Sequence, residues 1–385
     1  MQLGDVFAEV VDKKIEERLP VLAVTLDRGV VRRDSLDRKM DREVEQDAYL
    51  RALPGDIAYN TMRMWQGGSG LVREAGFISP AYTILRPKGE ECSEFWAHAF
   101  KAPEMIESFR CFSQGVAKDR LRLYYDQFAA VPALRPPLPE QRKIAAILSS
   151  VDETIEKAEA VLERLHLAKL SMMCDMLSDF ARGSMTWREM QLGHLARIRR
   201  GASPRPISDP RWFSEQGPGW VRISDVTRSR RVLLHTEQKL SQEGCARSVS
   251  IRPGDIIMSI AATVGKPIVS AIDACIHDGF VLLDQISPDV DRTFLFYLLQ
   301  WKSKELASLG QTGTQKNINT SIVAGLRVRL PTLQNQIRIA RALSAIDDYT
   351  ELSEIELEKL AAAQSALRIT LIKGDSQVEV DAIAR

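Results

Sequence analysis

The sequence predicts an α+β fold in which two tandem globular modules are separated by two long helices, paired as an antiparallel coiled coil about a pseudo-two-fold axis. Two observations support this prediction. Two stretches of roughly 40 residues space their apolar residues alternately three and four apart, as coiled coils do. The chain also repeats itself, because the recognisable segments of the first half recur in the second. We therefore expect a duplicated module–helix pair.

The first long helix is predicted over residues 135–178, directly after the proline-rich start RPPLPEQRK. Lys169 interrupts an otherwise apolar seam, and charged residues between the seam positions predict a solvated outer face. At 1.5 Å per residue such a helix is roughly 60 Å long. The seam consists of Ile144, Leu148, Val151, Ile155, Ala158, Leu162, Leu165, Met172 and Met176.

The second long helix is predicted over residues 331–373 and repeats the first at a shift of 195. Leu138–Asp152 falls on Leu333–Asp347, where seven of fifteen positions are identical. Gln364 takes the place of Lys169, and a polar residue at one seam position usually fixes register. The apolar seam continues through Ile339, Leu343, Ile346, Leu357, Leu360, Leu367 and Leu371.

The two modules are predicted over residues 1–134 and 190–330, with a linker at 179–189 and a tail at 374–385. MQLGDV opens the first module and MQLGHL opens the second. LPGDIAYN and RPGDIIMS each predict a Pro-Gly turn that leads into a strand. Short apolar runs and short helices follow in both halves before each long helix begins. A period near 190 residues is too long for a solenoid, so it indicates a duplicated domain pair.

Composition places the chain among ordinary globular proteins, with 45% hydrophobic and 27% charged residues. Its net charge of +1 gives no global argument for nucleic-acid binding, so any such argument depends on local patches. The five cysteines form no CxxC pair and predict free thiols in a reducing compartment. Neither a signal peptide nor a membrane span is evident, so we expect a cytoplasmic protein without membrane contact.

No catalytic signature is recognisable in the sequence. A GxGxxG motif after a strand is absent, and TVGKP lacks the first glycine and the Ser or Thr of a phosphate-binding loop. The five histidines show no metal-ligand spacing with the cysteines. We therefore predict no catalytic residue, no metal site and no cofactor in this chain.

The strongest binding signal is a stretch from Ala196 to Arg231 that holds nine arginines against three acidic residues. Trp212, Phe213 and Trp220 are interleaved with them and are expected to add planar surface. Arginine suits both phosphate contacts and bidentate recognition of guanine, whereas a solvated face is the competing interpretation. The DNA-binding candidates here are Arg199, Arg200, Arg205, Arg222, Arg228, Arg230 and Arg231, to which we add Lys266.

Weaker candidates lie elsewhere in both modules. The first module offers groups after its Pro-Gly strand and close to its long helix, namely Arg63, Trp65, Gln66, Lys118 and Arg120. The second offers a loop of small polar residues, Thr314, Gln315, Lys316 and Asn317, whose groups can reach a base edge or a phosphate. An ordinary polar loop is the alternative. Two similar heads on a fixed spacer suit a bipartite, inverted target, and duplex DNA is the commonest such target.

The chain resembles the specificity subunit of type I restriction-modification systems over nearly its whole length. Three features carry this resemblance: the internal repeat, the helix start RPPLPEQRKIAAILSSVD and the PGDI strand. The resemblance implies that each module is a target-recognition domain for one DNA half-site. It implies that the long helices set the gap between half-sites and dock two methyltransferase subunits, which use S-adenosylmethionine to methylate adenine. Restriction subunits using ATP and Mg are also implied.

Under this resemblance the spacer and partner-binding residues lie along both long helices. They are Gln141, Ile144, Leu148, Val151, Ile155, Leu162, Leu165, Gln336, Ile339, Leu343, Ile346, Leu357 and Leu360. The second helix departs from the pattern, because Gln334 and Asn335 stand where the first has Pro139 and Glu140. We expect this to change the start of the helix locally and not its role.

Two other classes of protein stay open at this point. One is a non-catalytic coiled-coil scaffold that binds proteins and no DNA. The other is a self-contained nuclease or methyltransferase with a diverged site, which would be active alone. Within the resembling family, restriction with methylation, methylation only and a related phage-defence complex are all compatible with the sequence.

Overall fold

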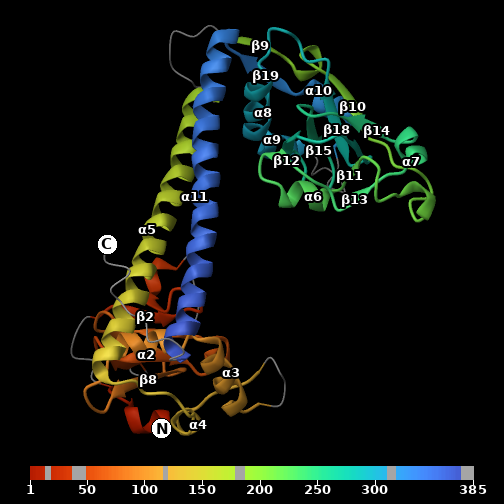
Figure 1. Cartoon of the computed structure of the whole chain (residues 1–385). Coiled ribbons are helices and arrows are strands. Elements are labelled where there is room, and N and C mark those ends of the chain that lie inside the picture. The colour runs from red at the N-terminus through yellow and green to blue at the C-terminus, as the bar shows by residue number, and fades with distance from the viewer. Residues whose placement is uncertain (14–18, 37–48, 116–119, 178–186, 310–317, 374–385) are drawn as a thin grey trace, which may run out of the picture. The chain divides into compact units, whose positions relative to one another are not determined.

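The computed structural model describes residues 1–13, 19–36, 49–115, 120–177, 187–309 and 318–373. The chain divides into two compact units. Unit 1 comprises Met1–Val161 and Ser353–Arg385, and unit 2 comprises Leu162–Leu352. Each unit therefore holds one module and part of each long helix. Figure 1 labels the long helices as α5 (Leu138–Leu177) and α11 (Leu333–Lys373).

Unit 1 contains two four-stranded sheets and several short helices. The first sheet has the order β1-β8-β5-β6, and the second has the order β3-β2-β7-β4. The strands are β1 (Phe7–Val10), β2 (Val21–Val24), β3 (Val30–Arg32), β4 (Leu50–Ala52), β5 (Ile57–Asn60), β6 (Ser69–Leu71), β7 (Gly76–Ile78) and β8 (Tyr82–Pro87). The helices are α1 (Leu3–Val6), η1 (Arg33–Ser35), η3 (Met64–Gln66), α2 (Ser93–Ala99), α3 (Pro103–Phe112) and α4 (Tyr125–Ala129).

Unit 2 contains a five-stranded sheet ordered β10-β18-β15-β16-β12, a four-stranded sheet ordered β13-β11-β17-β14, and the pair β19-β9. The strands are β9 (Arg188–Gln191), β10 (Arg197–Arg200), β11 (Gly219–Val221), β12 (Val232–Leu233), β13 (Gln238–Lys239), β14 (Val249–Ile251), β15 (Ile256–Ser259), β16 (Pro267–Ser270), β17 (Ala274–Ile276), β18 (Phe280–Asp284) and β19 (Arg327–Leu330). The helices are η4 (Leu192–His194), η5 (Pro210–Trp212), α6 (Ile223–Arg228), α7 (Gln242–Ala246), α8 (Arg292–Trp301), α9 (Ser303–Leu309) and α10 (Thr320–Gly325).

The sheets of the two modules share one topology. In the first sheet β5 pairs with β6 and β8, just as β15 pairs with β16 and β18. In the second, β2 lies parallel to β7 and antiparallel to β3, just as β11 lies parallel to β17 and antiparallel to β13. The duplication and the α+β class predicted from the sequence are therefore confirmed.

The Pro-Gly turns have the same geometry in both modules. Gly55 and Gly254 adopt φ angles of 92° and 88°, a conformation that favours glycine over residues with a side chain. The aspartate that follows each glycine closes the turn, since Asp56 accepts the Leu53 amide and Asp255 accepts the Arg252 amide. The turns lead directly into β5 and β15, as the sequence predicts.

Each module packs its core against the long helices of its own unit. In unit 1 the aromatic core around Phe7, Trp96 and Phe128 includes residues from both α5 and α11, among them Ile144 and Leu371. In unit 2 the core around α8 likewise includes residues of both helices, with Met173 and Leu177 from α5 and Ile339 and Leu343 from α11. Module and helix pair thus form one core within each unit.

The two long helices run antiparallel within each unit. In unit 1, Gln364 of α11 donates a hydrogen bond to Asp152 of α5. In unit 2, Lys169 of α5 pairs with Asp347 of α11 at 2.7 Å. Figure 1 shows α5 and α11 side by side in each unit. Both contacts obey one antiparallel register, because moving 17 residues along α5 moves the partner 17 residues back along α11.

A glutamine common to both helix starts ties each long helix to its module. Gln141 accepts the amide of Cys92 and donates to Glu91 and to the carbonyl of Pro136. Gln336 accepts the amide of Asp291 and donates to the carbonyls of Asp289 and Pro331. Cys92 and Asp291 are the residues that precede α2 and α8. Both glutamine side chains are buried, so they hold the junction instead of facing a partner.

Acid is expected to destabilise unit 1 through His98. Burial lowers the pKa of His98, while Asp152 and Glu94 raise it and Arg368 and Arg73 lower it further. Because the folded pKa lies below the ordinary value of 6.5, the unfolded chain binds more protons, and stability is lost as pH falls through and below that value. The protection factors of the α2 amides, which correct for the slower intrinsic exchange at lower pH, should fall between about pH 7.5 and pH 5.5.

Replacing His98 by glutamine should remove most of this pH dependence. Tyr297, which occupies the corresponding place in unit 2, does not change charge in this range, so α8 serves as the internal reference. Equal acid sensitivity in α2 of the parent chain and of His98→Gln would exclude His98 as the cause.

Candidate nucleic-acid interface

The second module has a segment that the first module lacks. In the first module β2 and β3 are joined by a tight turn in which the amide of Thr25 bonds the carbonyl of Gly29 at 2.7 Å. In the second module the corresponding strands β11 and β13 are joined by residues 222–237, which form α6 and the additional strand β12. This insertion carries four of the predicted arginines, Arg222, Arg228, Arg230 and Arg231.

Two arginines of the insertion converge on one carboxylate. Arg222 and Arg228 both donate to Glu237, and the hydrogen bond from Arg228 is the main cause of a lowered pKa of Glu237. Asp225 accepts the Arg222 amide at 2.8 Å and thereby fixes the start of α6. The Arg228 side chain is 58% exposed, so its remaining donors face solvent. Asp225 also lies 3.9 Å from the Arg222 guanidinium, so the two arginines are matched by two carboxylates, and it is the exposure of Arg228 that makes it a candidate.

The arginines of the edge strand β10 are held in the same manner. Arg197 donates twice to Asp284 of β18 at 2.7 Å, and Arg199 donates to the same carboxylate at 2.7 Å. The Arg197 hydrogen bond is the largest cause of a lowered pKa of Asp284. Arg200 donates to the backbone carbonyl of Asp278 at 2.9 Å. Asp278 also accepts from Arg205 at 3.1 Å.

The two tryptophans of the arginine stretch do not supply the exposed planar surface expected from the sequence, and Phe213 is half-buried. Trp212 and Trp220 are buried, and Trp220 packs against Leu240 and Cys275. The Trp212 ring nitrogen donates to the carbonyl of Pro206, and its ring lies beneath the Arg211 guanidinium at 4.1 Å. Burial of apolar area in a small second core outweighed exposure, so this expectation is wrong.

Two of the predicted DNA-binding residues are engaged inside unit 2. Arg231 donates to Asp348 of α11 at 2.6 Å and to the Tyr297 hydroxyl at 3.5 Å. Lys266 donates to the backbone carbonyls of Thr227 and Ser229, and burial lowers its pKa. Their contacts hold the insertion against the helix and the sheet, so we assign them a supporting position.

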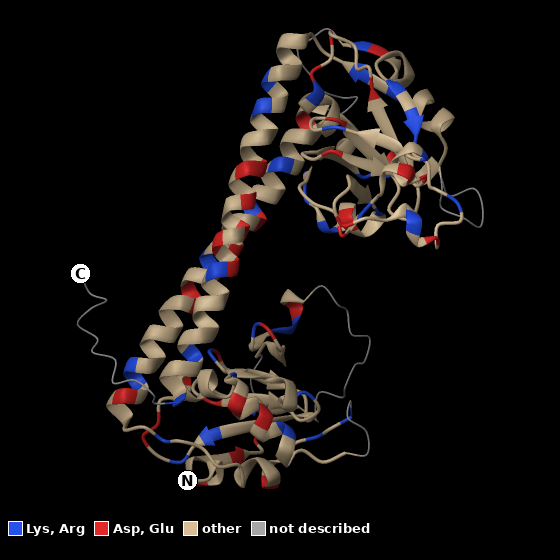
Figure 2. Ribbon diagram, turned by 45° about the vertical axis from the view of Figure 1, so that its right-hand side comes forward, with Lys and Arg blue, Asp and Glu red and all other residues tan. Residues whose placement is uncertain are grey.

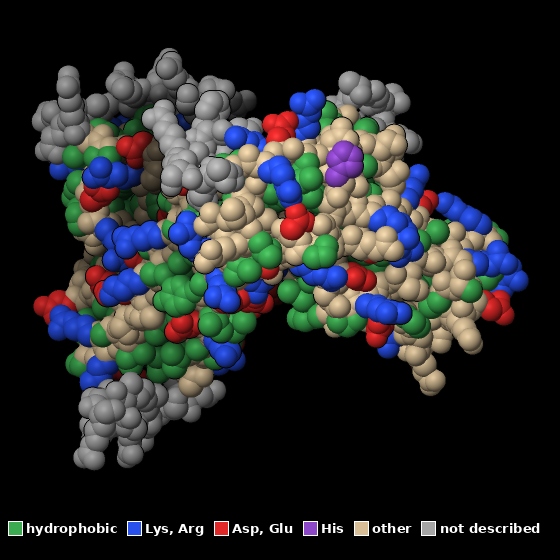
Figure 3. Space-filling view, turned by 90° about the horizontal axis from the view of Figure 1, so that it is seen from above, with side chains coloured by type: hydrophobic (Ala, Val, Ile, Leu, Met, Phe, Trp, Pro, Cys, Tyr) green, Lys and Arg blue, Asp and Glu red, His purple; other side chains and the backbone are tan. Residues whose placement is uncertain are grey.

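Counting charges within the stretch overestimated its positive excess. The sequence sets three acidic residues against nine arginines, but the fold adds Asp278, Asp284, Glu237 and Asp348 from outside the stretch. Figure 2 shows basic and acidic residues interspersed in both units, and the face shown in Figure 3 has the same mixture. The most exposed cations of the stretch are therefore better candidates than the stretch as a whole.

Three candidates of the first module lie at η3, which follows β5: Arg63 directly precedes η3, and Trp65 and Gln66 belong to it. Arg63 donates to Gln66 at 2.8 Å, and both side chains are exposed. Trp65 is half-buried, and its ring nitrogen donates to the carbonyl of Met62. Arg120 is exposed. Lys118, Thr314, Gln315, Lys316 and Asn317 lie outside the described residues.

The predicted spacer residues divide into two groups by exposure. One group is buried and comprises Gln141, Ile144, Leu148, Leu162, Gln336, Ile339 and Leu343. The other is half-buried along the helix pair and comprises Val151, Ile155, Leu165, Ile346, Leu357 and Leu360. Apolar residues also lie exposed on the long helices, among them Leu167, Leu170 and Leu352. Heptad spacing alone did not identify these three.

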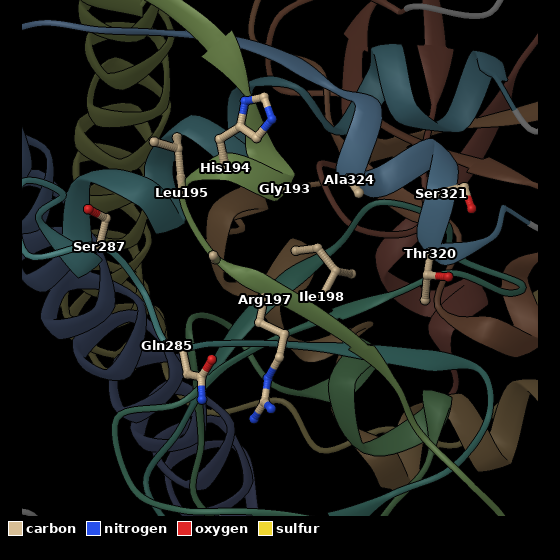
Figure 4. Close-up of a pocket in the computed structure, with 11 residues that line it drawn as sticks. Gly193, His194, Leu195, Arg197, Ile198, Gln285, Ser287, Thr320, Ser321 and Ala324 are labelled. Atoms are coloured by element: carbon tan, nitrogen blue, oxygen red, sulfur yellow. The ribbon is translucent and has the colours of Figure 1, made fainter.

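A hollow of about 660 Å³ lies between η4, β10 and α10 in unit 2. Figure 4 shows Thr320, Ser321 and Ala324 on one side of it and Leu195 and Ser287 on the other. Its lining mixes apolar side chains with hydroxyl and amide groups and the His194 imidazole, and its guanidinium, Arg197, is already held by Asp284. This lining gives no concentration of charge that would favour a nucleic acid.

Within the described parts of the chain, no three or more His, Cys, Asp or Glu side chains are grouped so that they could hold a metal ion. None of the described helices is both long enough and apolar enough to cross a membrane. The absence of a metal, a cofactor and a catalytic residue in this chain stays a prediction from the sequence.

Comparison with known proteins gives consistent matches. Residues 185–362 match the family described as "Type I restriction modification DNA specificity domain". The chain is 26% identical over 262 residues to a Methanocaldococcus jannaschii protein provisionally named type I restriction enzyme MjaX specificity subunit. That alignment covers 63% of this chain and 59% of the relative, so the chain spans about three fifths of it.

Two further matches cover nearly all of the chain. The type I restriction enzyme MjaVIII specificity subunit of the same organism is 22% identical over 395 residues, covering 97% of this chain and 89% of the relative. The solved S subunit of a type I restriction-modification system from M. genitalium has a TM-score of 0.64 at 14% identity. It covers 97% of this chain and 95% of its own, which establishes a common fold.

Proposed function

We propose that the chain is a member of the type I restriction-modification specificity-subunit family and that it reads a bipartite DNA site on behalf of the subunits that modify or cut DNA. One observation supports this proposal most: the module is present twice with one topology, and each copy is joined to its long helix by the same buried glutamine. Two equivalent heads fit a target with two half-sites.

Each module would read its own half-site with its own loops. In the second module the insertion 222–237 is the best candidate, because it presents the exposed Arg228 at the end of α6 and the exposed Arg230 just after it. Asp225 fixes the start of this short helix, and Glu237 holds Arg228. A guanidinium held by one carboxylate keeps donors for a phosphate or a guanine edge. In the first module the exposed Arg63 and Gln66 occupy the turn after β5.

The chemistry would be performed by partner subunits. Two methyltransferase subunits that use S-adenosylmethionine would dock on the long helices and methylate adenine. Restriction subunits with ATP and Mg would complete the complex where they are present. This chain would supply the position and the sequence of the target, and no step of bond breaking.

DNA binding by the complex of this chain with its methyltransferase partner tests the proposal. We expect binding that weakens steeply with salt, as phosphate contacts require. Replacing Arg228 by alanine should weaken binding about tenfold. If Arg228 reads a base, preference at one position of the second half-site will relax. If it contacts a phosphate, the slope of log affinity against log salt concentration will become shallower by about one for every DNA sequence.

Arg341→Ala is the matched control, because Arg341 is an exposed arginine on α11, outside the segments proposed to read DNA. Its affinity and salt slope should equal those of the parent chain. A complex that shows no DNA binding even at low salt would instead support a protein-only scaffold.

A further inference from the structure

Unit 2 contains a polar junction where its module meets both long helices. Tyr297 of α8 donates to Asp347 of α11 at 2.8 Å and contacts Ser344 at 3.3 Å. Lys169 of α5 pairs with the other oxygen of Asp347 at 2.7 Å, and its ammonium lies 5.4 Å from the Tyr297 ring centroid. Lys169 and Asp347 are 17% and 18% exposed, so both charges are largely removed from water.

Unit 1 contains a junction of the same plan. His98 of α2 contacts Ser149 of α5 at 3.2 Å and lies 3.8 Å from Asp152. Gln364 of α11 donates its amide hydrogen to Asp152. A module helix, its own long helix and the opposite long helix therefore meet at one carboxylate in each unit.

The two junctions occupy equivalent positions in the duplicated sequence. A shift of 195 relates their long-helix members, which are Ser149 and Ser344, Asp152 and Asp347, and Lys169 and Gln364. In each unit, the polar residue that interrupts one heptad seam therefore contacts the repeated aspartate of the other long helix. The chemistry differs, because unit 2 uses an ion pair and unit 1 uses a neutral amide and a histidine.

Only one register of the helix pair satisfies these groups. A displacement of one heptad would place Asp347 opposite Leu162 or Met176 instead of Lys169. A carboxylate and an ammonium buried without partners are costly, whereas apolar seam positions exchange partners with little discrimination. Polar seam residues are a known means of fixing register in coiled coils.

We propose that the two junctions are positioning sites that fix where each module sits along the helix pair, and thereby the separation at which the two modules read DNA. This inference rests on the proposed DNA-reading function. It assigns the setting of the gap to particular polar residues and not to helix length alone. Lys169, Asp347 and Tyr297 hold the position in unit 2, and Gln364, Asp152 and His98 hold it in unit 1.

Charge reversal at Lys169 and Asp347 tests the inference in the complex with the methyltransferase partner. Lys169→Asp and Asp347→Lys each place like charges together, and the combined variant restores an ion pair. We measure methylation at sites with the parent gap relative to sites one base pair longer or shorter. This ratio should fall about tenfold in each single variant. In the combined variant it should return to within about twofold of the ratio of the parent chain.

Two variants serve as references. Glu163→Arg also reverses a charge on α5, but at an exposed position outside the junction, and should leave the ratio unchanged. Lys169→Gln copies the residue found at Gln364 and should have a smaller effect than Lys169→Asp. If a charge-reversed single variant does not fold, Lys169→Gln still tests the prediction.

A second measurement reports register without DNA. Leu165→Cys and Thr350→Cys introduce cysteines at facing seam positions of unit 2, in a chain whose exposed Cys111 and Cys174 are replaced by serine. The rate of disulfide formation between these two cysteines should fall about tenfold when either Lys169→Asp or Asp347→Lys is present. It should return to the parent rate when both are present.

The two measurements separate the possible outcomes. Unchanged gap preference and unchanged disulfide rate in both single variants would overturn the inference. Unchanged gap preference with a slowed disulfide rate would also overturn it, because register would then not set the gap. A parent chain that directs no split-site methylation, with the disulfide rates as expected, would refute the DNA-reading function and leave the register role intact.

Discussion

Inserting one heptad into each long helix is expected to widen the gap between the two half-sites by about three base pairs. Seven helical residues add about 10.5 Å, and duplex DNA rises about 3.4 Å per base pair. Insertions between Val161 and Leu162 and between Leu352 and Ser353 leave the contacts inside each unit unchanged. Methylation mapping in cells carrying the extended chain and its partner would show the new gap directly.

The half-sites themselves should stay the same in the extended chain, because neither module is altered. A heptad inserted into α5 alone is the control, since it shifts the seam of one helix against the other and should reduce methylation at every gap. An extended chain that reads the parent gap with parent efficiency would contradict the spacer role of the helices.

Replacing Gln336 by alanine is expected to destabilise unit 2 by about 3 kcal/mol or more. The change removes three hydrogen bonds and leaves the amide of Asp291 and the carbonyls of Asp289 and Pro331 without this partner. Each buried polar group left unpaired costs about 1–3 kcal/mol. Denaturant-dependent hydrogen exchange in α8 measures the effect.

Gln334→Ala is the matched control, because Gln334 lies half a turn away on α11 and is exposed. Gln141→Ala should destabilise unit 1 by a comparable amount, because Gln141 makes the corresponding contacts there. Equal stability of Gln336→Ala and Gln334→Ala would show that the glutamine does not hold the junction.

Features encoded by short-range patterns could be predicted from the sequence. The heptad seams predicted α5 and α11, and the Pro-Gly pairs predicted β5 and β15, because each pattern reports its own local geometry. The repeat predicted that both modules share one topology. Lys169 and Gln364 interrupt the seam visibly in the sequence, whereas their partners Asp347 and Asp152 follow only from the pairing of the helices.

Features that depend on distant segments could not be predicted. Glu237, Asp284 and Asp278 neutralise arginines that look unpaired when charges are counted along the chain. Trp212 and Trp220 are buried because other segments cover them. Gln141 and Gln336 were expected in a spacer and partner-binding role, yet they bond backbone groups of the modules. The identity of the two glutamines in the repeat was the one available signal.

Mapping of methylated adenines tests the central claim most directly. Cells carrying the methyltransferase partner would be compared with and without this chain, and with a chain whose residues 190–330 come from another member of the family. We predict a split motif that appears only with this chain, and an exchanged module that changes one half of that motif. Methylation that is the same with and without the chain would contradict the account.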